Sequence, residues 1–580
     1  MLLLPFMRLW KRKTGPARRV AREIDPDEIF LDSRNLPQFN RHQFEGRFEQ
    51  PIARRVIFAV GTVGTLILLL FLLKSAALQI EDGARYRRLS EENRLRHTLL
   101  FGERGIITDR RGEKLAWNAP PRNGGEFSER RYKDAPGLSH VMGYLSYPRK
   151  DRGGFYYQVD FEGVDGAEKH FNERLAPEHG LRIVETDALG AVRSESVLRR
   201  PEGGKSVALA IDARVQGALY GFMESLAKER GFTGGAAALM DAQTGELLAL
   251  TSFPEYRSQT LTDGTDREGI ERFRTSPKTP FLNRATEGLY TPGSIVKPFV
   301  AVAALEEGVI TPEKTIYSSG SISVQNPFDP AKPTVFRDWK AHGAVSMKEA
   351  LAVSSDVYFY AIGGGFEEQR GVGIQNIEKY LRLFGFGEEQ GGSDFSSAVG
   401  VIPSPEWKRE QFNGDAWRLG DTYHTAIGQY GLQVTPLEAV RAVAAIANGG
   451  TLLAPRLARD ARALSRALAL PLRASSLALV GEGMRDAVRF GTARALSLPF
   501  LTIAAKTGTA ELGTSRRSVH SWAVGFFPYE KPRFAFAVVM EKGPRENTVG
   551  ALFVMRELLE WMSVHTPEYL EATVTSNGNK

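Results

Sequence analysis

The sequence predicts an α+β protein in which helices cover one antiparallel sheet, preceded by a single transmembrane helix and a small, mostly β domain. Three observations support this prediction. The stretch 56–73 has no charged residue and is long enough to cross a bilayer. Strand-like apolar runs lie near both ends of the region 205–565, and a helix-rich passage, about 345–490, separates them. Strands from the two extremities of one domain form one sheet when the inserted helices pack on it.

Composition narrows the possible classes of function. The chain has 580 residues, 42% hydrophobic and 25% charged, so it is a globular protein long enough for two to four domains. Its net charge is +7, but residues 1–55 hold 12 Lys/Arg and 7 Asp/Glu, so +5 of this charge lies in the N-terminal tail. The rest of the chain is nearly neutral, and we therefore expect no nucleic-acid partner.

The absence of cysteine excludes disulfides, thiolate metal sites and a cysteine nucleophile. None of the nine histidines lies in an H-E-x-x-H motif. We therefore predict neither a metal site nor a cofactor.

The N-terminal part predicts a membrane anchor. Residues 1–55 mix basic and acidic clusters without sustained periodicity, so we expect a poorly ordered tail. The predicted transmembrane helix covers 56–78, and Arg54, Arg55 and Lys74 flank its uncharged run. The two flanks are equally basic, but a long domain crosses a membrane largely regardless of its charge. The short tail is therefore expected in the cytoplasm, and the larger domains outside.

The segment 79–204 is polar and contains many short elements, which predicts a small β-rich domain. Residues 104–116 are expected to form two strands joined by a turn at 109–112, and 163–175 a short helix. No nucleophile with a neighbouring base occurs here, so we interpret the segment as a non-catalytic pedestal for docking or dimerisation. A phosphate loop at 199–206 is excluded, because the motif needs a glycine where this chain has an arginine.

The region 205–565 is predicted to be one larger domain that holds the sheet. The end of the chain, 566–580, is polar and typical of a disordered tail. The predicted strands of the domain are 207–212, 236–240, 246–251, 501–509, 521–527 and 534–541, and its predicted helices include 213–230 and 549–562.

An S-x-x-K motif opens a helix that is apolar on every side and is therefore expected to be buried. Ser294 and Lys297 lie about one turn apart, so the hydroxyl and the amine face the same way and are close enough to share a proton. Serine needs a base to act as a nucleophile, and a lysine can serve if desolvation and a second cation lower its pKa. The unpaired N–H groups of the helix start suit an oxyanion.

Two further motifs complement this pair. Ser354 offers a hydroxyl that can relay a proton to a leaving group, and Asp356 a carboxylate that can hold a lysine. In the strand that carries Lys506, Thr507, Gly508 and Thr509, the lysine can hold an anion, the glycine can let a substrate backbone approach, and the N–H of Thr509 can donate to an oxyanion. Each motif is weak alone, but the order S-x-x-K, S-x-D, K-T-G within one domain is a strong signal.

With these motifs the chain resembles the class B penicillin-binding proteins, most closely the elongation-type branch known as penicillin-binding protein 2. The resemblance extends from the membrane span to about residue 565. Ala505 and Ile295-Val296 depart from the common family residues, and the region 120–200 is shorter than usual. Beyond the three motifs, the resemblance rests on the segments 78–80, 93–94, 104–110, Asn283-Arg284-Ala285, Arg337-Asp338-Trp339-Lys340, Gly420-Asp421-Thr422, Ile427-Gly428-Gln429 and Thr435-Pro436-Leu437.

The resemblance implies a penicillin-binding, serine β-lactamase-like transpeptidase fold and a role for each motif residue. Ser294 would be the acylated nucleophile, Lys297 its base and Ser354 the proton relay. Asp356 would belong to the lysine network; an aspartate here is typical of elongation-type members. Lys506 and the Thr507-Gly508-Thr509 strand would hold the substrate carboxylate or a β-lactam. The N–H groups of Ser294 and Thr509 would form the oxyanion hole.

The implied function is a D,D-transpeptidase that crosslinks peptidoglycan stem peptides ending in D-Ala-D-Ala during cell-wall elongation. It would be anchored in the bacterial inner membrane, with its catalytic domain periplasmic or extracellular. The implied partners are a membrane glycosyltransferase of the SEDS type and elongation-complex scaffold proteins. The alternatives are a division-type transpeptidase, a D,D-carboxypeptidase or β-lactamase-like hydrolase, and a non-enzymatic wall scaffold, although the intact motifs argue against the scaffold. A bifunctional synthase has little room for a glycosyltransferase domain before the motifs.

Overall fold

The computed structural model describes residues 53–92, 95–121, 124–186, 192–326, 329, 331–389, 397–459, 467–513 and 516–570. Most of the predicted N-terminal tail and most of the predicted C-terminal tail lie outside these residues. The described chain divides into two compact units with a boundary between residues 94 and 95.

The first unit is helical. α1 (Arg54–Ala76) continues through the π-helical turn η3 (Ala77–Glu81), and α2 (Gly83–Glu92) follows. The continuous helix 54–81 is long and apolar enough to cross a membrane, and no residue of α1 is buried within the protein. The hydroxyl groups of Thr62 and Thr65 donate to backbone carbonyls one turn earlier, so each is satisfied within the helix.

The core of the second unit is a five-stranded sheet in the order β13-β12-β22-β21-β20, and all four pairings are antiparallel. Two strands come from the start of the domain and three from its end, which confirms the predicted sheet. The strands are β12 (Gly234–Asp241), β13 (Leu247–Phe253), β20 (Ala504–Leu512), β21 (Ser518–Phe527) and β22 (Phe534–Pro544).

Side chains of this sheet alternate between two hydrophobic cores. On β22, Ala537 and Val539 belong to one core, whereas Phe536 and Val538 belong to the other. This is the alternation expected of a strand whose two faces are both covered. The sheet is therefore the middle layer of three.

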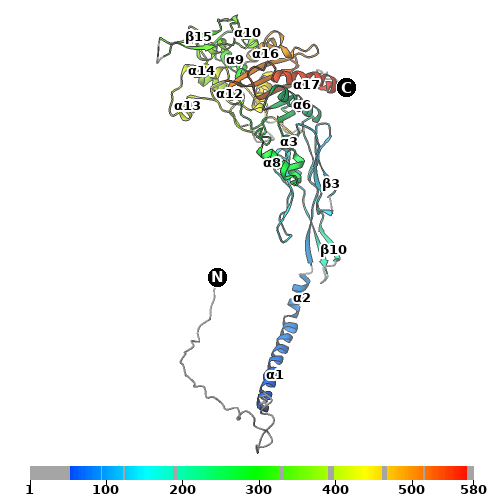
Figure 1. Cartoon of the computed structure of the whole chain (residues 1–580). Helices are drawn as coiled ribbons and strands as arrows, with labels where there is room; N and C mark the ends of the chain where they lie inside the picture. The colour runs from blue at the N-terminus through cyan, green and yellow to red at the C-terminus, as the bar shows by residue number, and fades with distance from the viewer. Residues whose placement is uncertain are drawn as a thin grey trace, which may run out of the picture. The chain divides into compact units, whose positions relative to one another are not determined.

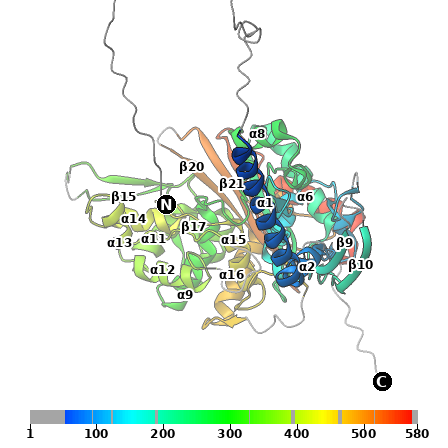
Figure 2. The ribbon, with the colours of Figure 1, turned by 90° about the horizontal axis from the view of Figure 1, so that it is seen from below.

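Helices form the two outer layers. α6 (Ala213–Arg230) and α17 (Ala551–His565) pack on one face, and α15 (Pro436–Ala447) and α16 (Ala474–Arg489) pack on the other. Figure 1 shows the helices from α9 to α16 gathered in one part of the domain, and Figure 2 shows α6 on the opposite side of β21 from them. The remaining described elements of this region are α7 (Ser258–Asp263), α8 (Arg267–Thr275), η5 (Gly293–Val296), α9 (Lys297–Glu306), α10 (Met347–Val353), α11 (Asp356–Gly364), α12 (Ile374–Leu383), α13 (Pro405–Gln411), α14 (Leu419–Ala426), η7 (Arg494–Leu496), η8 (Pro567–Tyr569) and the paired strands β14 (Ile316–Ser318) with β17 (Gly343–Val345), β15 (Ser321–Val324) with β16 (Thr334–Arg337) and β18 (Thr451–Leu452) with β19 (Leu468–Ala469).

The pedestal region is β-rich, as predicted. One sheet has the order β1-β9-β10 and a second the order β11-β2-β3-β4. The predicted hairpin at 104–116 is present, and Gly112 in its turn has φ +86°. The elements are β1 (Leu95–Leu100), β2 (Ile107–Thr108), β3 (Lys114–Ala119), β4 (Glu129–Tyr132), α3 (Ser139–Met142), β5 (Leu145–Ser146), β6 (Arg149–Lys150), β7 (Tyr156–Gln158), β8 (Glu162–Gly163), α4 (Gly166–His170), α5 (Asn172–Leu175), β9 (Gly180–Thr186), β10 (Val192–Arg199) and β11 (Val207–Ala208).

Two predictions need correction. The run 207–212 was assigned to the large sheet, but only β11 forms there, and it pairs in parallel with β2 of the pedestal. Its apolar side chains are buried as expected, but burial does not reveal which strand is the partner. The single helix predicted at 163–175 is two short helices, α4 and α5.

A buried ion cluster joins the elements of the pedestal. The Glu168 carboxylate accepts from Arg104 and from Arg130, each at 2.7 Å, and all three side chains are almost fully buried. Because removing one member would leave an unpaired buried charge, this cluster constrains the packing of α4 against β4 and the 104–116 hairpin.

Candidate active site

The turn that carries Ser294 is held from two sides. Ser294 lies in η5, directly before α9. The indole Nε1 of Trp522 on β21 donates to the Thr291 carbonyl at 3.0 Å, and the N–H of Gly293 donates to the Gly428 carbonyl at 2.9 Å. Ser294 itself is half-buried, so its hydroxyl lies on a fixed turn with access to solvent.

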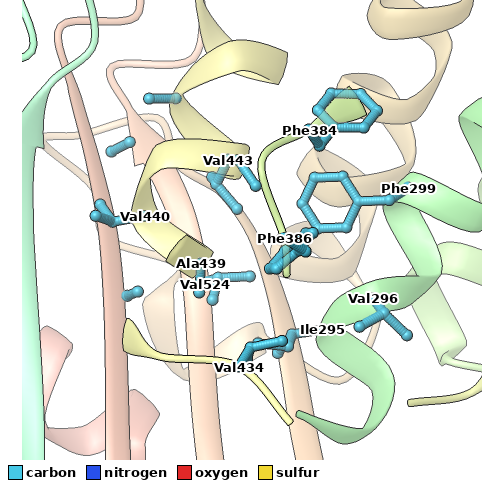
Figure 3. Packing of buried hydrophobic residues seen from close by; sticks show 14 of the residues in the cluster. Ile295, Val296, Phe299, Phe384, Phe386, Val434, Ala439, Val440, Val443 and Val524 are labelled. Atoms are coloured by element: carbon cyan, nitrogen blue, oxygen red, sulfur yellow. The ribbon is translucent and has the colours of Figure 1, made fainter. Parts of the chain in front are cut away.

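The helix behind this turn is buried on every side, as its sequence predicts. All residues from Lys297 to Leu305 are buried. Phe299 contacts Phe384 and Phe386, with ring centroids 4.9 and 5.0 Å apart. Figure 3 shows these rings together with Ile295 of the Ser294 turn and with side chains of α15. The turn therefore rests on a packed core.

Ser354 is held between the two motif lysines. Lys506 Nζ donates to the Ser354 hydroxyl at 2.8 Å, and Lys297 Nζ donates to the same oxygen at 3.3 Å. Lys297 also donates to the Ser354 carbonyl at 2.8 Å and to the Asp356 carboxylate at 2.6 Å. The structure thus brings Lys297, Ser354, Asp356 and Lys506 into one hydrogen-bonded network.

Local backbone geometry presents the Ser354 hydroxyl to both lysines. α10 ends at Val353, the next residue, Ser354, has φ +58°, and α11 begins at Asp356. A left-handed conformation is unusual for a residue other than glycine and costs on the order of 1 kcal/mol or more. Such strain persists only where the surroundings enforce it, and here α10, α11 and the two lysine side chains do so.

Burial dominates the electrostatics of the network. Both lysine side chains are fully buried. Burial and the neighbouring Lys297 lower the pKa of Lys506 well below its ordinary value. The Asp356 carboxylate forms an ion pair with Lys297.

The predicted contact between Ser294 and Lys297 is not made as a hydrogen bond. Within the described residues the Ser294 hydroxyl has no hydrogen-bond partner, because the Lys297 amine is directed to Ser354 and Asp356. An ammonium group binds a carboxylate more strongly than a neutral hydroxyl.

Gly508 has a structural role that the sequence did not indicate. A Cβ at this position would lie 2.6 Å from the Pro292 carbonyl oxygen and 2.9 Å from Ile295 Cγ2. The glycine therefore lets the Ser294 turn approach β20, and its predicted role toward the substrate backbone stays a prediction. Thr509 also borders this turn, since a Cβ on Gly293 would lie 2.9 Å from the Thr509 carbonyl oxygen.

Thr507 and Thr509 extend along the edge strand of the sheet. The Thr507 hydroxyl donates to Thr492 at 2.8 Å, and Thr509 is exposed. Among the described strands, β20 pairs only with β21, where Lys506 and Thr509 lie opposite Val524 and Ser521. Within the described part of the chain, no strand pairs with the other edge of β20, which is the edge an extended peptide could use.

Sequence reasoning missed the residues that hold the motifs in place. The buried Asp338 carboxylate accepts from the Ser355 hydroxyl at 2.8 Å and from the Val357 N–H at 3.0 Å. Burial raises the pKa of Asp338, but these bonds outweigh it, and the pKa lies below its usual value. Asp338 thereby fixes the start of α11 behind Ser354, although the sequence identified its segment only by resemblance.

The sequence identifies the segment that contains Gly428 only by its resemblance to the family. Gly428 has φ +81°, and a Cβ there would lie 2.0 Å from the Gly293 carbonyl oxygen. Only glycine therefore allows the end of α14 to meet the Ser294 turn. In the described part of the chain, no group of His, Asp or Glu side chains is arranged to hold a metal ion.

Three features define the penicillin-binding, serine β-lactamase-like class of transpeptidase folds. They are a serine turn beside the edge strand of a five-stranded antiparallel sheet, a second serine between two buried lysines, and a K-T-G sequence on that edge strand. Residues 235–558 match the family "Penicillin binding protein transpeptidase domain", and residues 125–209 match the "Penicillin-binding Protein dimerisation domain". The chain belongs to the penicillin-binding protein transpeptidases, and its domain pairing and relatives are of the class B, PBP2 type.

Individual relatives support this family assignment. The "Peptidoglycan D,D-transpeptidase MrdA" of Acinetobacter baumannii is 28% identical over 86% of this chain and 86% of its own length. PBP2 of Helicobacter pylori, solved in a complex with MreC, is 27% identical, with a TM-score of 0.67 over 81% of this chain and 98% of that one. PBP2 of Pseudomonas aeruginosa is 28% identical, with a TM-score of 0.68 over 83% and 99%.

Proposed function

We propose that this protein is a membrane-anchored peptidoglycan D,D-transpeptidase of the elongation type, acting through an acyl intermediate on Ser294. The observation that carries the proposal is the Ser354 hydroxyl, which accepts from both Lys297 and Lys506 behind the Ser294 turn. The relatives named peptidoglycan D,D-transpeptidase MrdA and the PBP2 complex with MreC support the substrate class and the elongation role.

In the first half-reaction the Ser294 oxygen attacks the carbonyl carbon of the penultimate D-Ala. The N–H groups of Ser294 and Thr509 would stabilise the oxyanion. The proton that leaves Ser294 passes through Lys297 and Ser354 to the nitrogen of the departing D-Ala. The C–N bond breaks, and an ester on Ser294 remains.

Lys506 is suited to hold the terminal carboxylate of the substrate. An approaching carboxylate favours the ammonium form of a lysine and raises its pKa, which burial and Lys297 hold low in the free protein. Substrate binding would therefore favour the ammonium form of Lys506, and the same event would change the hydrogen bonds of Ser354. In the second half-reaction an amine of a neighbouring stem peptide attacks the ester, and the crosslink forms.

We further propose the division of the chain into a cytoplasmic tail (1–55), a membrane span (56–78), a pedestal (79–204), a transpeptidase domain (205–565) and a terminal tail (566–580). The apolar helix 54–81 supports a single-pass anchor. The pedestal, whose described residues form no catalytic network of their own, would dock a SEDS-type glycosyltransferase and scaffold proteins. The solved relatives that support this are a PBP2–MreC complex and a peptidoglycan synthase complex, the latter 26% identical with a TM-score of 0.69.

The test uses the full chain in detergent, a thioester analogue of the stem peptide and a D-amino acid as amine acceptor. The parent should release the thiol and form the amide product. Ser294→Ala should form neither, whereas Ser225→Ala, which removes an exposed serine on α6, should match the parent. Release of the thiol with hydrolysis only, at every acceptor concentration, would identify a carboxypeptidase and overturn the transpeptidase assignment.

A further inference from the structure

Thr492 lies between the K-T-G strand and the helix that leads to Ser354. It follows α16 in the chain, and its N–H donates to the Ala352 carbonyl of α10 at 3.0 Å. Its hydroxyl accepts from the Thr507 hydroxyl of β20 at 2.8 Å. Thr492 thus connects the strand that is expected to hold the substrate with the segment that presents Ser354.

The backbone around Thr492 is closely packed. A Cβ on Gly491 would lie 2.0 Å from the Ala352 carbonyl oxygen, so the glycine lets this segment approach α10. The next residue, Ala493, is buried, and its N–H donates to the Ala487 carbonyl of α16 at 2.9 Å. These contacts are made by backbone atoms, and they therefore do not depend on the Thr492 hydroxyl.

The partner of that hydroxyl, Thr507, is adjacent to the proposed carboxylate-binding lysine. Lys506 Nζ donates to the Thr507 carbonyl at 3.0 Å and to the Ser354 hydroxyl at 2.8 Å. Thr507 is half-buried, and so is Thr492. Lys506 and Thr507 can therefore offer neighbouring donors to one anion, an arrangement in which each bond is strengthened by the charge.

Counting hydrogens shows what the second threonine can add. A hydroxyl has one hydrogen to donate, and an ionised carboxylate can only accept. In the free protein the Thr507 hydrogen is directed to Thr492. To bind a carboxylate, Thr507 must turn this hydrogen away, and Thr492 can then donate its own hydrogen to the Thr507 oxygen. Hydrogen bonds in such a chain polarise one another, so Thr507 becomes a stronger donor.

We propose that Thr492 is a positioning residue that determines specificity for substrates ending in a carboxylate, a role that rests on the proposed transpeptidase function. The Thr507 hydroxyl donates to the carboxylate, the Thr492 hydroxyl donates to the Thr507 oxygen, and Lys506 binds the same anion. No covalent bond forms or breaks in this step, because only the two hydroxyl hydrogens turn. Since the Thr492 N–H is bonded to α10, the carboxylate is held at a fixed place relative to Ser354.

The experiment uses the full chain in detergent and two thioesters of the same acyl-D-alanine. The leaving group of one is mercaptoacetate, which places a carboxylate where the terminal D-Ala has one, and that of the other is the neutral mercaptoacetamide. Thr492→Val and Thr492→Ala remove the hydroxyl, Thr492→Ser keeps it, and Thr275→Val is a matched control on an exposed threonine of α8.

The value to compare is kcat/KM for thiol release. In Thr492→Val and Thr492→Ala we expect it to fall about tenfold for the carboxylate thioester and to stay within about twofold for the amide thioester. Thr492→Ser should restore most of the loss, and Thr275→Val should match the parent with both substrates.

Three results would overturn the proposal. The first is a parental kcat/KM for the carboxylate thioester in both variants that lack the hydroxyl. The second is an equal loss with the two thioesters, because this indicates a structural role. The third is a Thr492→Ser protein as impaired as Thr492→Val. A parent protein that releases no thiol from either thioester would contradict the proposed function itself, and with it this role, so the two failures are distinguishable.

Discussion

The close approach of β20 to the Ser294 turn leads to a quantitative prediction for Gly508→Ala. The added methyl group would lie 2.6 Å from the Pro292 carbonyl oxygen, whereas an ordinary contact begins near 3.4 Å. The turn must therefore retreat by roughly 0.8 Å, and a displacement of about 1 Å at a reacting group can reduce its rate about 10²-fold. Overpacking of this kind also destabilises a protein by about 1–3 kcal/mol.

The assay measures two quantities, the rate of acylation by a fluorescent penicillin and the midpoint of thermal unfolding without ligand. We expect both to fall in Gly508→Ala. The control is Gly221→Ala on α6, where the added methyl group contacts nothing within 4 Å and neither quantity should fall. If Gly508→Ala lowered acylation but left the unfolding midpoint unchanged, the glycine would serve the substrate and not the turn, and our reasoning would be refuted.

Three other perturbations test separate parts of the account. In Lys506→Met, the free energy of unfolding should rise less steeply between neutral pH and about pH 10 than in the parent. The reason is that the lowered pKa of Lys506 makes the unfolded parent chain bind more protons than the folded one in that interval. Urea unfolding across pH measures the free energy, and equal pH slopes in the two proteins would contradict the prediction. Asp338→Ala should lose about 1–3 kcal/mol of stability and also slow acylation, because the Ser355 hydroxyl and the Val357 N–H lose their acceptor. Asp338→Asn should lose less stability and slow acylation less. Identical effects of the two substitutions would exclude the hydrogen bonds as the cause. Protease added outside spheroplasts should digest the second unit and spare the tail 1–55, and the reverse pattern would overturn the proposed topology.

Much of the fold could be predicted because the central sheet is apolar on both faces. β21 has no Asp, Glu, Lys or Arg, and β22 has none before Glu541. α6 begins and ends at the predicted residues. The error at 207–212 has a physical cause: the segment is buried, but its hydrogen-bond partner is β2, about 100 residues earlier in the chain. Composition and periodicity report burial and do not identify the partner strand.

In the candidate site, the motifs predicted which polar side chains meet, and the network around Ser354 contains four of them. Contacts between distant segments could not be predicted in the same way. Gly508 against Pro292, Gly428 against Gly293 and Asp338 behind Ser355 each join residues whose neighbours in the sequence give no sign of the contact. The lowered pKa of Lys506 likewise depends on its burial and on Lys297, which lies far away in the sequence.

The central claim is that Ser294 is the acylated nucleophile and Lys297 its base. Intact-protein mass spectrometry after incubation with penicillin tests it most directly, with peptide mapping to locate the adduct. We predict that the parent gains one penicillin mass on Ser294, that Ser294→Ala gains none, and that Lys297→Ala is acylated far more slowly, because residues that act as a unit lose most of their effect when either is removed. A Ser294→Ala protein that still gains one penicillin mass on a defined residue would contradict the nucleophile, and a Lys297→Ala protein acylated at the parental rate would contradict the base.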